Sequence, residues 1–371
     1  MNNNNNSNRN IHTEFYDYFH YDKKDKYYWN LESVSKDDQN KRSVFSGQNK
    51  QDENDCIYVK QIKLSFNFND KYDTIQILRE IYFLVILRNQ PYIVPLEDIL
   101  LDNTENCTRV FLIFKGNNVS LNKLISYSGD YLSNKDLIKW ILYQISYGLY
   151  ILHSNKIIHN DIKPSNILIN EVGGVTICDF GSAAYKEEES NSFTRYYVPP
   201  EFLNDLRIIR DEKSDIWGLG VIMIELYLKK NRFFKCTDDI KNNENQLKYL
   251  LSKCGFGDDK NYEDIKKLGD IFSDAKIQFS QEEIKLIDDK EAIDLINHLL
   301  CLDPNKRYNI KQVLDSKYFE VPELKEYKKS LDIQELDGKN IYKKLGELIN
   351  ENKFFEIISE LICLLNELKQ K

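Results

Sequence analysis

The spacing of apolar residues predicts a β-rich first part of the chain and a helical second part. Between residues 31 and 64, short apolar runs alternate with polar positions, most regularly at residues 56–60, and this pattern indicates strands. Residues 74–87 instead carry apolar side chains at helical spacing and are followed by prolines, so we expect one helix there. A further buried strand is predicted over residues 110–114.

From residue 136 onward the periodicity is mostly helical. The longest apolar stretch, residues 216–228, is apolar on all sides apart from Glu225, which is typical of a buried central helix. It is shorter than the roughly 18 residues that cross a membrane, so we expect no membrane span. Residues 354–368 have the pattern of an amphipathic helix, which either packs on the helical part of the protein or binds a regulatory partner.

Composition narrows the class of protein. The 371 residues are 42% hydrophobic and 12% aromatic, enough to bury the core of a body with two lobes. A formal net charge of −8 gives no electrostatic reason to bind nucleic acid or an anionic membrane, and the asparagine-rich start lacks the apolar run of a secretory signal. The seven cysteines never occur as C-x-x-C, which favours reduced thiols in an intracellular protein of the cytoplasm or nucleus.

Two short motifs carry the clearest chemistry. Residues 159–166 read HNDIKPSN, and the triplet DFG follows at 179–181 after an apolar run. Either motif alone arises often by chance in an ordinary turn, but the two at this separation are specific. They resemble the catalytic loop H-R-D-x-K-P-x-N and the D-F-G triplet of protein kinases. The resemblance implies an α+β fold of two lobes: a small β-rich lobe with one helix and a large, mainly helical lobe.

The resemblance also gives each polar residue of the two motifs a task in phosphoryl transfer. Asp161 would orient the substrate hydroxyl and accept its proton, while Lys163 would steady the γ-phosphate of ATP. Asn166 and Asp179 would hold Mg²⁺ against the phosphates. A lysine at position 163 is similar to serine/threonine kinases, so the expected substrate is a protein with a serine or threonine acceptor.

Nucleotide binding is predicted upstream, where residues 57–60 read IYVK and resemble the V-A-I-K strand of the family. Lys60 would reach the α- and β-phosphates of ATP and pair with Glu80 on the predicted helix. The other nucleotide contacts that the resemblance implies are Val44, at the end of the phosphate-covering loop, and the hinge residues Lys115, Gly116 and Asn117.

Three positions depart from the family pattern. Residues 35–44 contain none of the glycines of G-x-G-x-x-G-x-V, which let backbone N–H groups approach the phosphates. Tyr58 shares a strand face with Lys60, where the family has alanine beneath adenine, so its ring would crowd ATP. Asn160 replaces the arginine that in many kinases binds a phosphate on the activation segment, so activation by phosphorylation of that segment is not expected.

The resemblance continues downstream. Residues 194–201 read TRYYVPPE, like the end of an activation segment, and the resemblance implies that Glu201 pairs with Arg307 of the motif LDPNKR. Asp215, at the start of the predicted central helix, is expected to bond the catalytic-loop backbone. Thr194 is expected to contact the catalytic aspartate and lysine.

The residues of these motifs are most similar to those of the CMGC group of kinases and, within it, to glycogen synthase kinase. Val198 departs from that group, which has an arginine there. Possible phosphorylation sites in the activation segment are Ser190, Ser192 and Thr194.

Three functions fit these motifs: an active serine/threonine kinase, which we favour; a pseudokinase that serves as a scaffold or binding module; and a small-molecule kinase, which the peptide-substrate element at 194–201 argues against. The resemblance covers about residues 30 to 320. The predicted organisation is an N-terminal extension at 1–29, an N-lobe at 30–116, a C-lobe at 117–320 and a helical extension at 321–371.

Overall fold

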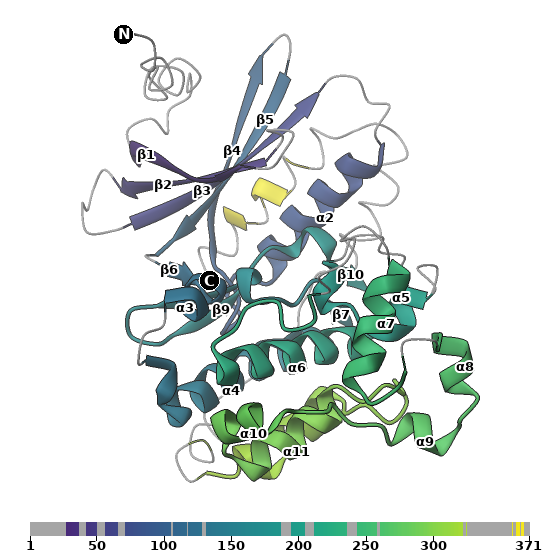
Figure 1. The fold of residues 1–371 in the computed structure, drawn as a ribbon. Coiled ribbons are helices and arrows are strands. Elements are labelled where there is room, and N and C mark those ends of the chain that lie inside the picture. Colours follow the sequence, from purple (N-terminus) through teal and green to yellow (C-terminus); the bar gives the residue numbers. More distant parts are fainter. Residues whose placement is uncertain are drawn as a thin grey trace, which may run out of the picture. The chain divides into compact units, whose positions relative to one another are not determined.

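The computed structural model of the protein describes residues 27–36, 42–49, 56–65, 71–104, 107–116, 118–127, 131–186, 194–204, 211–235, 243–257, 260–321, 324, 358, 361–363, 365 and 366. These residues form two compact units (Figure 1). The first unit takes in the described residues within Met1–Asn89, Val94–Asn117 and Asp337–Lys371. The second unit takes in Gln90–Ile93 and the described residues within Asn118–Leu336.

The first unit is built on an antiparallel sheet with the strand order β1-β2-β3-β5-β4. Its strands are β1 (Tyr27–Lys36), β2 (Arg42–Asn49), β3 (Cys56–Ser65), β4 (Leu96–Thr104) and β5 (Cys107–Lys115). Alternation along β3 buries Ile57 and Val59 in an apolar cluster with Phe45, Phe111 and Ile113. The strands predicted from the sequence are therefore confirmed, and β5 is longer than expected.

Helix α2 (Lys71–Ile86) is the helix predicted over residues 74–87. Its apolar positions, including Ile77 and Ile81, are buried at helical spacing, which is what holds an amphipathic helix in place. Glu80 is also buried, with 1% of its surface exposed, so its charge needs a partner within the unit.

The second unit is mainly helical. Its helices are α3 (Leu121–Tyr127), α4 (Lys135–Ser154), α5 (Pro200–Asn204), α6 (Glu212–Leu228), α7 (Asn243–Lys253), α8 (Tyr262–Lys266), α9 (Asp270–Ser273), α10 (Gln281–Ile287), α11 (Lys290–Leu299) and α12 (Ile310–Leu314). Short strands also occur: β6 (Asn118–Ser120), β8 (Ile167–Asn170) and β9 (Val175–Ile177) form one sheet, and β7 (Ile157–Ile158) pairs with β10 (Ala184–Tyr185). Single 3₁₀ turns complete it: η1 (Tyr131–Ser133), η2 (Pro164–Asn166), η3 (Phe180–Ser182), η4 (Arg195–Tyr197) and η5 (Lys317–Phe319).

Helix α6 lies in the middle of the second unit (Figure 1) and is buried from Ser214 to Tyr227, which confirms the predicted central helix. The catalytic-loop residues pass directly over it. At Gly218 an added Cβ would lie 2.6 Å from the carbonyl oxygen of Ile162, so only glycine lets the loop approach this closely. Among the described helices, none is long and apolar enough to cross a membrane.

The C-terminal segment corrects one expectation. Ile358, Leu361 and Leu365 are fully buried at helical spacing, but they belong to the first unit and not to the helical second unit on which we expected them to pack. The apolar periodicity identifies a face that must be covered and does not specify which surface covers it. These three side chains are buried within the chain.

Candidate active site

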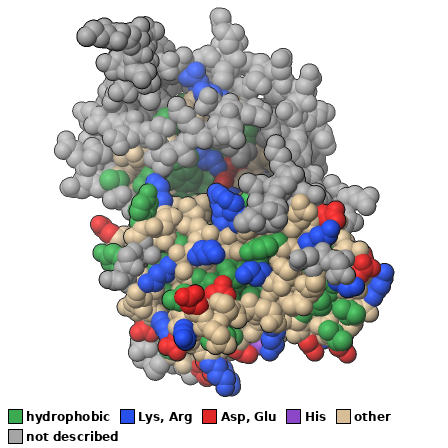
Figure 2. Space-filling view, in the orientation of Figure 1, with side chains coloured by type: hydrophobic (Ala, Val, Ile, Leu, Met, Phe, Trp, Pro, Cys, Tyr) green, Lys and Arg blue, Asp and Glu red, His purple; other side chains and the backbone are tan. Residues whose placement is uncertain are grey.

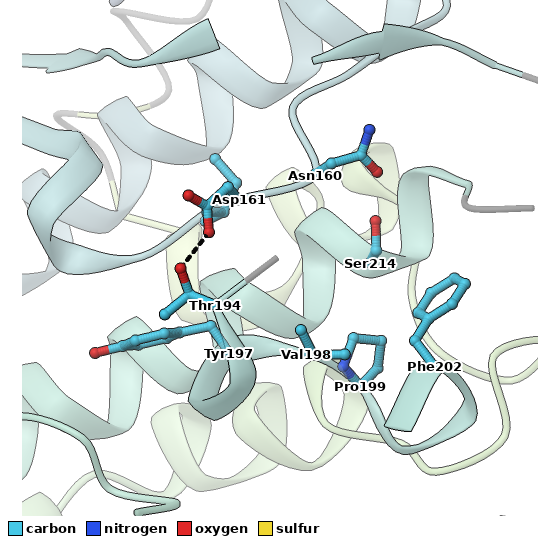
Figure 3. A pocket seen from close by; sticks show the side chains of 9 residues that line it. Asn160, Asp161, Thr194, Tyr197, Val198, Pro199, Phe202 and Ser214 are labelled. Atoms are coloured by element: carbon cyan, nitrogen blue, oxygen red, sulfur yellow. Dashed lines mark hydrogen bonds between the residues drawn. The ribbon is translucent and has the colours of Figure 1, made fainter. Parts of the chain in front are cut away.

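The catalytic-loop residues form one hydrogen-bonded group in the second unit. The Nζ of Lys163 lies 2.5 Å from Oδ2 of Asp161 and also donates to the hydroxyl oxygen of Thr194, at 2.7 Å. The Thr194 hydroxyl in turn donates to Oδ1 of Asp161 at 2.7 Å, as Figure 3 shows. The expected contacts of Thr194 are thus confirmed, and a carboxylate, an ammonium and a hydroxyl meet at one point.

Asn166 joins the same group from η2. Its Nδ2 donates to the backbone carbonyl of Asp161 at 2.8 Å and to the carboxylate Oδ2 at 3.1 Å. The amide nitrogen is therefore committed to the loop, and the amide oxygen is the atom of this side chain that suits a metal ion.

The loop is anchored from below by Asp215, at the start of α6. Its carboxylate accepts hydrogen bonds from the backbone N–H groups of His159 and Asn160, each at 2.9 Å, as expected from the sequence. A third partner was not anticipated: Nε2 of His153 lies 2.9 Å from the same carboxylate. No sequence signal distinguishes His153, in the last turn of α4, from an ordinary helix-end histidine.

Asp179 adopts a left-handed backbone conformation with φ of 66° and ψ of 72°. Such a conformation in a residue other than glycine is concentrated at functional sites. The next residue, Phe180, is fully buried and packs edge-to-face on the ring of His159 at 5.0 Å. His159 Nε2 lies 3.1 Å from the carbonyl oxygen of Cys178 and therefore carries the proton, and the Cys178 N–H bonds the carbonyl of Asn166. These contacts link the two motifs directly.

Asn160, the residue in place of the family arginine, also has a positive φ, of 65°. Asparagine tolerates this region better than most residues. Its Nδ2 donates to the carbonyl oxygen of Ser182 at 3.1 Å. The side chain therefore holds the first residues of the activation segment with a neutral hydrogen bond, next to the pairing of β7 with β10.

A small pocket opens beside the catalytic aspartate (Figure 3). It is lined by Asn160, Asp161, Ile162, Thr194, Tyr197, Val198, Pro199, Phe202 and Ser214. Most of this lining is apolar or uncharged, and Asp161 is its one acid.

Two buried acids support the segment that follows Thr194. Glu201 and Arg307 form the expected ion pair, with Nη1 to Oε1 at 2.8 Å and Nη2 to Oε2 at 3.1 Å. The second acid, Glu225 in α6, accepts hydrogen bonds from the Phe233 N–H at 2.9 Å and from the Tyr197 hydroxyl at 3.2 Å. Burial raises the pKa of Glu225 to about 7, despite these hydrogen bonds.

The raised pKa of Glu225 predicts a pH dependence of stability. The pKa of Glu225 in the folded protein lies above the ordinary glutamate value of 4.5, so the folded protein binds this proton more tightly than the unfolded chain does. The resulting stabilisation is complete below pH 4.5 and is lost as the pH rises through 7. Relative to Glu225→Gln, the free energy of unfolding of the wild type should fall by about 3 kcal/mol across this range.

Chemical denaturation of both proteins between pH 5 and pH 8 measures this difference. Glu282→Gln, an exposed position in the first turn of α10, serves as the control and should show no such trend. A wild-type minus Glu225→Gln difference that stays constant with pH would contradict the assignment.

In the first unit, Lys60 and Glu80 form the expected ion pair, with Nζ to Oε1 at 2.5 Å. Val44 lies directly opposite Lys60 in the β2–β3 ladder, and Leu112 lies opposite it in the β3–β5 ladder. Tyr58 is half-buried on the same strand face as Lys60, as its spacing predicted. The candidate nucleotide-binding face of the sheet therefore carries a lysine, aliphatic side chains and one tyrosine.

The expected hinge is described in part. Lys115 ends β5 with its side chain exposed, and Gly116 follows with φ of 121°. The N–H of Gly116 already donates to the carbonyl of Cys56 at 2.8 Å, so it is not free to bond adenine. Asn117 lies outside the described residues, as do Asp37 and Asp38 of the glycine-poor loop.

Surface charge adds no further site on the face seen in Figure 2. Lys and Arg side chains are spread over the helical unit there, with Asp and Glu among them, and the described residues form no continuous basic stripe on this face. No cluster of three or more His, Cys, Asp or Glu suited to a metal occurs in the described part of the chain.

Known proteins are similar to this chain in sequence. Residues 41–319 match the protein kinase domain family. Cyclin-dependent kinase 8 of Drosophila melanogaster is 32% identical over 213 residues, which cover 50% of this chain and 47% of that protein. A probable CTD kinase subunit alpha homolog of Encephalitozoon cuniculi is 34% identical over 190 residues, covering 49% and 56%. Mitogen-activated protein kinase 14 of Arabidopsis thaliana is 30% identical over 277 residues, covering 72% and 73%.

The match spans most of the chain, and the chain therefore belongs to the protein kinase family. Its relatives include cyclin-dependent and mitogen-activated kinases, and these relatives support the CMGC-like character expected from the motif residues. The chain spans about half the length of the first two of these relatives.

Proposed function

We propose that the protein transfers the γ-phosphoryl group of ATP to serine or threonine hydroxyls of protein substrates. The observation that carries this proposal is the group formed by Asp161, Lys163, Thr194 and Asn166. Phosphoryl transfer depends on positioning and charge, and this group supplies a fixed carboxylate with a cation beside it. The kinase relatives support the same activity.

In this proposal Asp161 accepts the proton of the substrate hydroxyl. Thr194 and Lys163 each bond one of its carboxylate oxygens, which fixes the orientation of the carboxylate while lone pairs remain free for the substrate. Lys163 also places a positive charge where the transferred phosphoryl group would pass. The backbone anchors from Asp215 hold this arrangement in place.

ATP and Mg²⁺ are the cosubstrate and metal used across the protein kinase family, and the residues present fit them. The amide oxygen of Asn166 and the carboxylate of Asp179 are hard oxygen donors of the kind that Mg²⁺ prefers, with water and phosphate completing its coordination. The metal would neutralise phosphate charge. Lys60, held by Glu80, would contact the phosphates, and Val44 and the hinge carbonyls would contact the base or sugar.

We also place the protein in the cytoplasm or nucleus. The described cysteines, Cys56, Cys178, Cys254, Cys301 and Cys363, are free thiols, which supports a reducing compartment.

A thermal-shift titration with Mg-ATP, followed by a transfer assay, tests the proposal. The wild type should be stabilised by Mg-ATP and should phosphorylate a serine-containing protein mixture, whereas Asp179→Ala should lose transfer. Lys60→Gln removes the positive charge that would contact the phosphates, so this variant should bind Mg-ATP more weakly than the wild type. If the wild type shows neither stabilisation nor transfer, the chain is a scaffold and the proposal is wrong.

The hydrogen bond of Asn160 to the activation segment predicts that activity does not depend on phosphorylation of that segment. Because the Asn160 amide holds the activation segment by a neutral hydrogen bond, phosphatase treatment of the wild type should leave the transfer rate unchanged. Asn160→Ala should lower the rate about fivefold, since one hydrogen bond of about 1 kcal/mol is lost. Initial rates before and after treatment, with mass spectrometry of Ser190 and Ser192, provide the measurement. A rate that collapses on dephosphorylation would refute this role.

A further inference from the structure

Arg195, the first residue of η4, has a buried guanidinium N–H that lacks a partner in the described part of the chain. Its Nε is buried and has no hydrogen-bond acceptor. None of the ion pairs between described residues includes it. A buried N–H that lacks an acceptor is destabilising and calls for an explanation.

Three other described cations near this segment have partners. Lys163 bonds Asp161, and Arg307 bonds Glu201. Arg232 lies over the ring of Tyr196, with its guanidinium 5.8 Å from the ring centroid. Arg195 therefore differs from its neighbours in having a charge that the described part of the fold does not use.

Arg195 directly follows a residue of the candidate active site. The hydroxyl of Thr194 lies 2.7 Å from Oδ1 of Asp161, the carboxylate that a substrate hydroxyl must approach. Consecutive Cα atoms are about 3.8 Å apart, so substrate residues next to the phosphoacceptor lie within reach of an arginine side chain at position 195. The pocket beside Asp161 contributes no second acid that would compete for this guanidinium.

We infer that Arg195 binds an anionic group of the protein substrate close to the phosphoacceptor, so that the enzyme selects acidic or already phosphorylated sequences. The planar guanidinium presents paired donors that match a carboxylate or a phosphate. This inference rests on the proposed function, because it assigns a specificity residue to the same site.

Peptide kinetics test the inference. A set of peptides has one serine in an alanine background, with a single aspartate, phosphoserine or lysine at each position from −2 to +3. For the best position, wild-type kcat/KM should be about tenfold to a hundredfold higher for the anionic peptide than for the all-alanine peptide. Arg195→Gln should abolish this preference, and Arg195→Glu should favour the lysine peptide. Lys311→Ala, an exposed cation on α12, is the control and should keep the preference.

Binding of the same peptides, labelled with a fluorophore and measured by anisotropy without ATP, decides the inference independently of transfer. If no peptide is phosphorylated, the proposed function fails, but tighter binding of anionic peptides that is lost in Arg195→Gln would still support the inference. Equal binding and equal kcat/KM for anionic and neutral peptides would overturn it.

A phosphate on the chain itself is the alternative occupant of Arg195. In Ser190→Ala/Ser192→Ala, treated with phosphatase, the anionic preference should persist. If removing these phosphates creates or abolishes the preference, Arg195 binds a phosphate of its own chain and the inference is wrong. A preference for aspartate peptides assigns a carboxylate ligand, and a preference for phosphoserine peptides alone assigns a phosphate ligand.

Discussion

Replacing Asp161 with asparagine should reduce the rate of phosphoryl transfer about a thousandfold while leaving the protein folded. The asparagine oxygen can still accept the Thr194 hydrogen bond. Its amide nitrogen, however, would face two donors, Lys163 and Asn166, and it cannot accept a proton from the substrate. Initial rates of phosphate incorporation at saturating ATP measure the loss.

The control for this variant is nucleotide binding. Because Lys60, Asn166 and Asp179 are unchanged, Asp161→Asn should still be stabilised by Mg-ATP in a thermal-shift assay. A transfer rate within tenfold of the wild type would exclude Asp161 as the base.

Replacing Arg307 with methionine should destabilise the protein by about 3–5 kcal/mol, because Glu201 is left as a buried charge without its partner. The arginine is 1% exposed, donates to Glu201 through two nitrogens, bonds the carbonyl of Cys301 and lies 4.9 Å over the ring of Trp217. We expect a melting temperature roughly 10 °C lower, measured by calorimetry.

Two further variants test the cause of this loss. The double variant Glu201→Gln/Arg307→Met removes the unpaired charge and should recover part of the stability. Lys267→Ala removes one member of the exposed pair with Asp264 and should leave the melting temperature unchanged. If Arg307→Met melted like Lys267→Ala, the buried pair would be energetically unimportant.

Much of this architecture was predictable from sequence because each feature had a local signal. Helix α2 and the strands follow from apolar periodicity, within a few residues of their observed limits. The pairs Lys60–Glu80 and Glu201–Arg307 follow from the family resemblance, since the motifs place the partners although they are distant in sequence.

Other features had no such signal. The contacts of Asn160 with Ser182 and of Glu225 with Tyr197 depend on how separate segments pack, and neither residue type predicts its partner. The raised pKa of Glu225 follows from its burial. The apolar run around Glu225 predicted that burial, but it did not indicate which groups would donate hydrogen bonds to the carboxylate. The engagement of the Gly116 N–H by Cys56 is a matter of strand register, which sequence alone leaves open.

The anchoring of the catalytic loop has a consequence for control of the enzyme. Asp161, Lys163, Asn166 and Thr194 bond one another, and Asp215 fixes the loop backbone, all inside the second unit. The chemical machinery is thus preassembled by the helical core. If the first unit binds ATP as proposed, a signal that acts on this unit would change the turnover rate through nucleotide binding, and the site for the phosphoacceptor would stay assembled.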